Sequence, residues 1–448
     1  MKGSTVPTAY RRLGAGMAGL TLALTAACTG PDGADTSTAG AEAAGDEVKI
    51  AISPEDGTTK VRPNLPVTVT ADGGTITDVT IEQSQNTEAD AQNPADGEGT
   101  EAGEAEDGED TPDVDEVTGT LNEDKTEWVS DWNLIPGSDI TVTALAENEA
   151  GEETEVISEF STLEAAPGQR LELQSNFPTS GQEVGVGMPV IVNFDMPVEN
   201  KAQVENSMEV TSEETVEGAW NWFGDKMAVF RPKEYWQPNQ DVSVDLHLAG
   251  TEASDGVYGV KNYRIDFRVS REQISTIEND EYTMVVERDG KQIKSFPISN
   301  GDGSTRAYTT TSGTHLLMEK YEHLVMDSST VGVPVDSPDG YKLDVNYAVR
   351  FSNSGEFTHA APWNNRLGQA NLSHGCTNMS VADAKWYFEN ALMGDVLVIN
   401  GTDRQLEVDN GWGYWQRSWD EWLEHSETGE ADTTDGNGTP GDVHGEAV

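Results

Sequence analysis

The chain has 448 residues and a formal net charge of −53. This length is too great for one hydrophobic core and predicts about three domains. The negative charge argues against nucleic acid and anionic membrane surfaces as partners, because both would repel the chain.

Residues 1–27 have the features of a secretory signal peptide. Three basic residues precede a mostly apolar run, which small residues end just before Cys28. The run is too short to span a membrane as a helix. The position of Cys28 resembles a bacterial lipobox, which implies a lipid-modified residue and an extracytoplasmic protein held at the outer face of the cell membrane. The alternative is an ordinary cleaved signal peptide with an incidental cysteine. Residues 28–46 are then a linker.

Two β-rich units are predicted next, at residues 47–165 and 166–270. A turn followed by an alternating apolar strand begins near Pro54 and recurs near Pro178. Short alternating strands separated by Gly, Pro and Asn turns predict two immunoglobulin-like sandwiches. We expect them to act as stalks for a third domain.

Acidic, apolar-poor segments occur at residues 84–116 and 426–448. The first contains thirteen Asp or Glu and no Lys or Arg, and the second is also rich in Gly. Such segments lack the apolar side chains that offset the entropy of ordering. We therefore expect a disordered insertion in the first sandwich and a disordered tail. Calcium binding is the alternative for the insertion, but no EF-hand spacing is present.

Aromatic residues of the second sandwich allow two interpretations. Side chains of this kind usually pack in a sandwich core or between domains, and this is the role we expect. Carbohydrate or wall binding is the alternative. The residues are Trp220, Trp222, Tyr235 and Trp236.

A third domain is predicted at residues 271–402. Asp289-Gly290 favours a tight hairpin between two strands, because both turn positions need positive φ. Ser380 is typical of an N-cap and opens a helix to about Leu392. Further strands are expected at His315–Met318, Val345–Val349 and Val396–Ile399.

The chemistry of this domain centres on a single thiol. Cys376 lies in the run Ser-His-Gly-Cys-Thr-Asn, and thirteen residues separate His359 from the first serine of this run. A free thiol is mostly protonated at neutral pH, so a nearby imidazole is needed to ionise it. We expect Cys376 to be the nucleophile and His359 its base and ion-pair partner. The cysteine is predicted on a loop that enters a helix start, where the dipole would favour the thiolate.

The residues around the thiol have predicted supporting roles. Gly375 lets the backbone approach closely, and the N–H groups of Gly375 and Cys376 are placed to bind an oxyanion. His374 and Asn378 are expected to brace the loop or complete this hole, with a purely structural histidine as the alternative for His374. We expect no cofactor and no metal, because no carboxylate-rich or CxxC partner accompanies the two histidines. His315 and His323 are expected to be ordinary strand and loop residues.

This motif resembles the signature of the YkuD-type L,D-transpeptidase catalytic domain of bacterial cell walls. The segments around Met326, Gly340-Tyr341 and His359-Ala360-Ala361-Pro362-Trp363 resemble the actinobacterial branch, as does the layout of lipidated leader, two immunoglobulin-like domains and catalytic domain. The fold class that follows is mainly β. The resemblance also implies that a backbone carbonyl orients His359 next to Ala360.

The resemblance implies a substrate site and a reaction. Tyr341 would lie on a flap and donate toward the oxyanion, and Met326 and Trp363 would form pocket walls, with Ser373 and Asn378 also contacting substrate. Cys376 would release D-alanine from a peptidoglycan stem peptide as an acyl-enzyme, which an amine of a second stem then attacks. The family implies carbapenems as inhibitors. The alternatives are an L,D-carboxypeptidase and a non-catalytic wall-tethering lipoprotein.

Residues 403–425 form a Trp-rich extension. Ser418 and Glu421 have capping-box spacing, which predicts a short helix with Trp419, Trp422 and Leu423 on one face. We expect this extension to pack the catalytic domain against the second sandwich. Glycan binding is the alternative.

Overall fold

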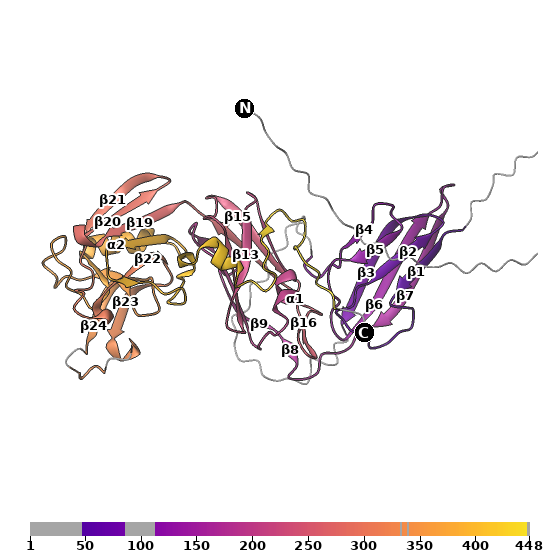
Figure 1. Cartoon of the computed structure of the whole chain (residues 1–448), viewed down its shortest axis with the longest axis horizontal. Helices are drawn as coiled ribbons and strands as arrows, with labels where there is room; N and C mark the ends of the chain where they lie inside the picture. The colour runs from indigo at the N-terminus through magenta and orange to yellow at the C-terminus, as the bar shows by residue number, and fades with distance from the viewer. Residues whose placement is uncertain (1–46, 86–112, 332–333, 338–339, 446–448) are drawn as a thin grey trace, which may run out of the picture. The chain divides into compact units, whose positions relative to one another are not determined.

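The computed structural model describes residues 47–85, 113–331, 334–337 and 340–445, all within one unit, Gly45–Val448. Most of the regular structure is strand, arranged as two β-sandwiches and a third β-rich domain (Figure 1). The predicted fold class is confirmed. The predicted signal peptide, Cys28 and residues 86–112 of the acidic insertion lie outside the described residues.

The first sandwich pairs a four-stranded sheet, β1-β2-β5-β4, with a three-stranded sheet, β3-β6-β7. Its strands alternate buried and more exposed positions, as β6 does along its whole length, and this places the apolar side chains between the sheets. The strands are β1 (Lys49–Ser53), β2 (Thr68–Asp72), β3 (Thr75–Gln85), β4 (Gly119–Leu121), β5 (Glu127–Ser130), β6 (Ser138–Glu147) and β7 (Glu153–Ser161).

The second sandwich is built from the sheets β10-β18-β15-β12 and β29-β13-β14-β11-β9, with a small sheet β16-β17-β8 beside them. The turn repeated between the sandwiches is confirmed, since Gly57 and Gly181 adopt φ of +75° and +76°. The elements are β8 (Arg170–Leu171), β9 (Leu173–Phe177), β10 (Glu183–Val184), β11 (Val190–Phe194), α1 (Lys201–Asn206), β12 (Met208–Ser212), β13 (Glu217–Phe223), β14 (Met227–Pro232), β15 (Gln240–Leu246), β16 (Glu252–Ser254), β17 (Val257–Gly259), β18 (Tyr263–Val269) and β29 (Asp432–Thr433).

The aromatic residues of the second sandwich pack inside the protein. Trp220, Trp222 and Trp236 are buried in its core. Tyr235 is partly buried, and its ring meets that of Trp415 edge to face at 4.5 Å. The packing interpretation of these residues is confirmed.

The third domain contains a six-stranded sheet, β21-β20-β19-β27-β22-β28, and a four-stranded sheet, β23-β24-β25-β26, with α2 packed against β24 and β25. Its elements are β19 (Gln273–Glu278), β20 (Thr283–Arg288), β21 (Lys291–Pro297), β22 (Thr311–Leu316), β23 (Lys320–Asp327), β24 (Lys342–Arg350), β25 (Phe357–Ala360), β26 (Thr377–Met379), α2 (Val381–Asn390), β27 (Val396–Asn400) and β28 (Arg404–Gln405).

Local signals in this domain are confirmed. Asp289 and Gly290 both have positive φ in the turn between β20 and β21. The Ser380 hydroxyl accepts a hydrogen bond from the Asp383 N–H and so caps α2, which ends at Asn390, two residues before the predicted end. In the described part of the chain, no helix is both long and apolar enough to cross a membrane.

The Trp-rich extension packs between the third domain and the second sandwich. Its helix α3 (Trp419–Leu423) begins with the predicted capping box at Ser418. Trp422 is fully buried in the core of the second sandwich, and its Nε1 donates to the Ala219 carbonyl at 2.9 Å. Gln416 donates to the Thr314 carbonyl of the third domain at 3.1 Å. The predicted packing role is confirmed.

A buried cation strengthens this packing. Arg231 is 2% exposed, and its guanidinium lies 4.6 Å from the Trp422 ring centroid and 4.7 Å from that of Trp415. Burial lowers the pKa of Arg231 to about 10. The guanidinium therefore stays charged at neutral pH and stacks on the aromatic faces.

The prediction of a disordered tail is wrong for residues 426–445. Strand β29 pairs with the edge strand β13, and buried Glu205 accepts hydrogen bonds from the hydroxyls of Ser426 and Thr428. Near its end the tail reaches the first sandwich, where Asn133 donates to the Val443 carbonyl at 3.1 Å. Composition predicts disorder from low apolar content, whereas this tail is ordered by strand addition and by bonds to a buried carboxylate.

Replacing Trp422 by alanine should destabilise the protein strongly. The change removes a fully buried indole and its hydrogen bond, so we expect a loss of about 3–5 kcal/mol in the free energy of unfolding, measured by denaturant titration. Trp363→Ala is the matched control, because that indole is 53% exposed. Equal losses for the two variants would contradict the packing role of the extension.

Candidate active site

Two neighbouring parallel strands bring the predicted nucleophile and base together. β25 carries His359 and β26 begins directly after Cys376, with Thr358 paired to Thr377 and His359 paired to Asn378. Because side chains alternate along a strand, Cys376 and Asn378 share one face with Phe357 and His359. The thiol and the imidazole are therefore diagonal neighbours on the same face of the sheet.

The predicted position of Cys376 at a helix start is wrong. Strand β26 follows the cysteine, and α2 begins only at Val381. The three residues of β26 pair with β25 and keep the chain extended before the cap. The helix dipole falls off within the first turn, so it gives the thiolate little support.

His359 is held in one orientation and one tautomer. Its Nδ1 lies 3.0 Å from the Ala360 carbonyl, which can only accept a hydrogen bond, so Nδ1 carries the proton. Its Nε2 then accepts from Asn378 Nδ2 at 3.2 Å. Asn364 donates to the Asn378 amide oxygen at 3.2 Å and fixes that amide. The expectation that a backbone carbonyl orients this histidine is confirmed.

Cys376 and His359 are both neutral in this conformation. Burial raises the pKa of the Cys376 thiol to about 12, with the Phe357 N–H opposing this shift and the Glu356 charge adding to it. Burial lowers the pKa of His359, although the hydrogen bond to the Ala360 carbonyl opposes this shift. In the described residues no hydrogen bond joins the two groups, and the thiol instead donates to the Gly355 carbonyl at 3.6 Å. The expected ion pair is therefore not formed here.

The glycine of the motif allows a tight loop, and its N–H is engaged. Gly375 has φ of +127°, a conformation that residues with a Cβ rarely adopt. Its N–H donates to the Ser373 hydroxyl at 3.2 Å, and its carbonyl accepts from Thr310 at 2.7 Å. The Ser373 hydroxyl donates in turn to the Cys376 carbonyl. Here Gly375 supports the loop, which corrects its expected role as an oxyanion donor in this conformation.

An apolar cluster lies beside the thiol. Met326 and Tyr341 pack with Cys376 in this cluster, and Trp363 is exposed with its ring centroid 6.1 Å from that of His359. Burial raises the pKa of Tyr341 to about 12, and repulsion from Cys376 and Tyr308 in their ionised forms adds to the shift. The Tyr341 hydroxyl is consequently a hydrogen-bond donor at neutral pH.

His374 is an exposed side chain between two tyrosines. Its ring meets Tyr308 edge to face with centroids 4.4 Å apart, and lies 5.4 Å from the ring of Tyr341. His374 therefore lies at the edge of the apolar cluster, beside Tyr341. Tyr308 was not predicted as a site residue, because it lies far from the cysteine motif in the sequence.

A buried acid beneath the loop was also missed by the sequence analysis. Glu356 is 3% exposed and accepts hydrogen bonds from the Thr311 N–H at 2.7 Å, the Ser352 hydroxyl at 2.6 Å and the Ser354 hydroxyl at 2.7 Å. His315, expected to be ordinary, is buried and bonded to the Thr311 hydroxyl at 2.8 Å. The only sequence signal was a glutamate immediately before a buried strand.

Comparisons with known proteins show which families this chain resembles. Residues 272–399 match the family described as the L,D-transpeptidase catalytic domain, and residues 109–252 match a bacterial Ig domain. The chain is 31% identical to L,D-transpeptidase 2 of Mycobacterium tuberculosis, over 84% of this chain and 84% of that protein. It is 35% identical to L,D-transpeptidase 1 of the same species, over 53% of this chain and 87% of that protein.

Solved structures give similar matches. A structure of an L,D-transpeptidase in complex with imipenem is 34% identical, with a TM-score of 0.45, over 51% of this chain and 98% of that chain. L,D-transpeptidase 3 from Mycobacterium tuberculosis with a faropenem-derived adduct is 31% identical, with a TM-score of 0.42, over 51% of this chain and 98% of that chain.

Glu356→Gln should lower the pKa of the Cys376 thiol. Burial is the larger cause of the raised pKa and remains in the variant, but the negative charge that also disfavours the thiolate is removed. The rate of iodoacetamide alkylation of Cys376, followed against pH, measures this shift. The control is Glu322→Gln, which neutralises an exposed glutamate on β23. An unchanged or higher pKa in Glu356→Gln would show that its charge does not act on the thiol.

Proposed function

We propose a function from one premise: this chain belongs to the L,D-transpeptidase family. The proposed reaction joins the third-position diamino acid residues of two peptidoglycan stem peptides. The observation that carries this proposal is the parallel pairing of β25 with β26, which gives Cys376 and His359 adjoining places on one sheet face.

In the first step Cys376 attacks the amide between the third residue of a tetrapeptide stem and its terminal D-alanine. The sulfur forms a bond to the carbonyl carbon, and His359 Nε2 takes the thiol proton. When the C–N bond breaks, the imidazolium gives this proton to the departing amine. D-Alanine leaves and a thioester remains on Cys376.

In the second step an amine takes the place of the thiol. The side-chain amine of the diamino acid on another stem attacks the thioester carbonyl, and neutral His359 removes the excess proton from the new amide. The C–S bond breaks and the sulfur is reprotonated. Water in place of the amine would give an L,D-carboxypeptidase reaction.

The neutral state of both groups supports proton transfer during the attack. A thiol with a raised pKa next to an imidazole with a lowered pKa is not ionised beforehand. A χ1 rotation of Cys376 moves the sulfur away from the Gly355 carbonyl and toward His359 Nε2. The Asn378 amide, which now donates to Nε2, gives up this bond in the same step.

Substrate binding is assigned to the residues around the thiol. The Tyr341 hydroxyl keeps its proton and donates to the oxyanion, which forms beside Cys376. Met326 and Trp363 form the walls that contact the stem peptide, with His374 at the edge of the apolar cluster. Ser373 holds the loop, and Asn378 holds the base until the thiol takes its place at His359 Nε2.

Location is a further part of the proposal. A lipid on Cys28 would hold the protein at the outer face of the membrane, and the sandwiches would carry the catalytic domain away from it. The net charge of −53 supports this arrangement, because an acidic chain is repelled by an anionic surface.

The wild-type protein should form a covalent adduct with a carbapenem at Cys376, since a β-lactam is a strained amide. Intact-mass spectrometry of the protein incubated with the drug measures it. Cys376→Ala should give no adduct, and His359→Ala should react about 10²–10⁴-fold more slowly, the usual contribution of a general base. Between pH 7.5 and 8.5 the wild-type rate should be flat, because burial holds the pKa of His359 below its ordinary value of 6.5 and the imidazole is neutral in this range.

The control for this experiment is His323→Ala, which removes an exposed histidine of β23. Its rate and pH profile should match those of the wild type. A wild-type rate that rises tenfold per pH unit, as a thiolate reacting without a base would require, would exclude the proposed role of His359.

Purified muropeptides distinguish the transferase from its alternatives. Disaccharide tetrapeptides incubated with the enzyme should give dimers linked through two third-position residues, with one D-alanine released per link, as measured by chromatography and tandem mass spectrometry. Tripeptide monomers with free D-alanine would identify a carboxypeptidase. An absence of any product from protein that does form the carbapenem adduct would contradict the proposed substrate.

A further inference from the structure

Two carboxylates face each other in the second sandwich, far along the sequence from the active site. Glu209 on β12 and Asp245 on β15 are direct partners in an antiparallel ladder, so their side chains share one face. Like charges in this arrangement repel each other. Arg264, the partner of Asp245 on β18, binds Asp245 Oδ2 at 2.8 Å, which offsets only part of the charge.

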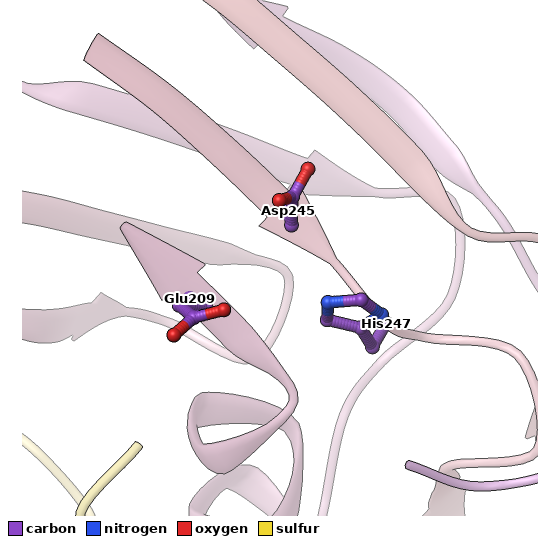
Figure 2. Close-up of side chains that lie close together, drawn as sticks. All are labelled: Glu209, Asp245 and His247. Carbon is purple, nitrogen blue, oxygen red and sulfur yellow. The ribbon is translucent and has the colours of Figure 1, made fainter. Parts of the chain in front are cut away.

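A histidine completes the group. His247 lies two residues beyond Asp245 and therefore on the same face. Glu209, Asp245 and His247 each offer one ligand atom, and these three atoms lie within 4.8 Å of one another (Figure 2). Among the described residues this is the one cluster of three or more His, Cys, Asp or Glu side chains with such spacing.

Polar atoms of this cluster are buried without partners. His247 is 7% exposed, and its Nδ1 makes no hydrogen bond. Asp245 Oδ1 is buried and also makes none, while Oδ2 holds Arg264. A buried polar atom without a partner is destabilising, so two in one cluster indicate that a ligand satisfies them.

Residues of the first sandwich hold the His247 imidazole in an orientation that suits a metal ligand. The indole of Trp132 stacks on the His247 ring with centroids 3.7 Å apart and planes 10° apart. The ring also donates a hydrogen bond to the Val114 carbonyl. A neutral ring that donates one N–H to a carbonyl has a lone pair on its other nitrogen, as a metal-bound histidine does.

We propose that Glu209, Asp245 and His247 bind a divalent transition-metal cation, with Zn²⁺ as the best match. One nitrogen and two carboxylate oxygens from three side chains are a ligand set that Zn²⁺ accepts, with water in the fourth position. Ca²⁺ and Mg²⁺ prefer oxygen ligands alone, so the histidine disfavours them. The cation replaces the repulsion between the two carboxylates by attraction to both.

Residues around the three proposed ligands hold one of them in place and form a cavity through which an ion can reach the site. The Gly438 N–H of the tail donates to Glu209 Oε1 at 3.0 Å. All three ligands line a cavity of about 1030 Å³, whose wall also includes the carboxylates of Asp131 and Asp442. A cavity lined with acids raises the local concentration of cations.

The cation has a structural role in this proposal. His247 is stacked on the first sandwich through Trp132, Asp245 belongs to the second sandwich, and Glu209 is bonded to the tail. A cation that fixes all three side chains makes the contacts among these parts stronger. The site needs no substrate and is independent of the reaction at Cys376.

Calorimetric titration of the full chain with ZnCl₂, after removal of metals with EDTA, tests the site. We expect one Zn²⁺ per chain, bound at least tenfold more tightly than Ca²⁺ or Mg²⁺ from their chlorides. Glu209→Gln keeps the side-chain size and an oxygen for the Gly438 N–H, so it should fold, and it should weaken Zn²⁺ binding at least tenfold. Zn²⁺ should raise the melting temperature of the wild type and not that of Glu209→Gln.

The control separates this site from the general acidity of the chain. His323 and Asp344 form an exposed pair with His323 Nε2 3.5 Å from Asp344 Oδ1, and His323→Ala/Asp344→Asn should bind Zn²⁺ as the wild type does. Equal Zn²⁺ affinity in the wild type and Glu209→Gln overturns the proposal. So does a wild type that binds Zn²⁺ no more tightly than Ca²⁺.

Discussion

The parallel pairing of β25 with β26 is the constraint on which the active site depends. Parallel strands need a long connection, and the residues between His359 and Cys376 provide it. The pairing fixes which residues share a face, so a slip of one position would turn either the thiol or the imidazole to the other side.

The packing that positions these groups also keeps them neutral. Burial disfavours both the thiolate and the imidazolium, and the bonds to Gly355 and Asn378 occupy the atoms that would exchange a proton. A resting cysteine held in this way is protected from oxidants, because these react with the thiolate. In the proposed mechanism, reactivity depends on a substrate that displaces these two hydrogen bonds, so that the thiol reacts only when substrate is correctly bound.

The sequence predicted the features that local residues determine. The Asp289-Gly290 turn, the Ser380 cap and the Trp face of α3 depend on neighbours within a few positions, and all three were confirmed. The cysteine motif identified the family for the same reason. Composition failed for the tail, because its order comes from bonds to β13 and Glu205, more than two hundred residues earlier.

Interactions between strands that are distant in the sequence explain the other features that the sequence did not predict. Glu356 acts on Cys376 from a place where the two sheets of the domain meet: the Thr311 N–H of β22 bonds to it, and it directly precedes β25 of the other sheet. No periodicity shows this in advance. Glu209 and Asp245 are opposed only through the register of β12 with β15. The expectation that Cys376 lies at a helix start failed for the same reason. The three residues Thr377-Asn378-Met379 form a strand only because they pair with β25, and their sequence alone does not indicate a strand.

The C-terminal residues join the domains at two places, and this has a consequence for folding. Residues 412–423 pack between the second sandwich and the catalytic domain, and residues 426–445 extend from the second sandwich to the first. Each sandwich has its own core and is able to fold when its strands have been made, because domains usually fold as units during synthesis. The contacts between domains depend on residues that are made after β1 to β18. Buried Trp422 and Glu205 therefore acquire their final partners only at that stage, and until then the second sandwich exposes an apolar surface where the extension will pack.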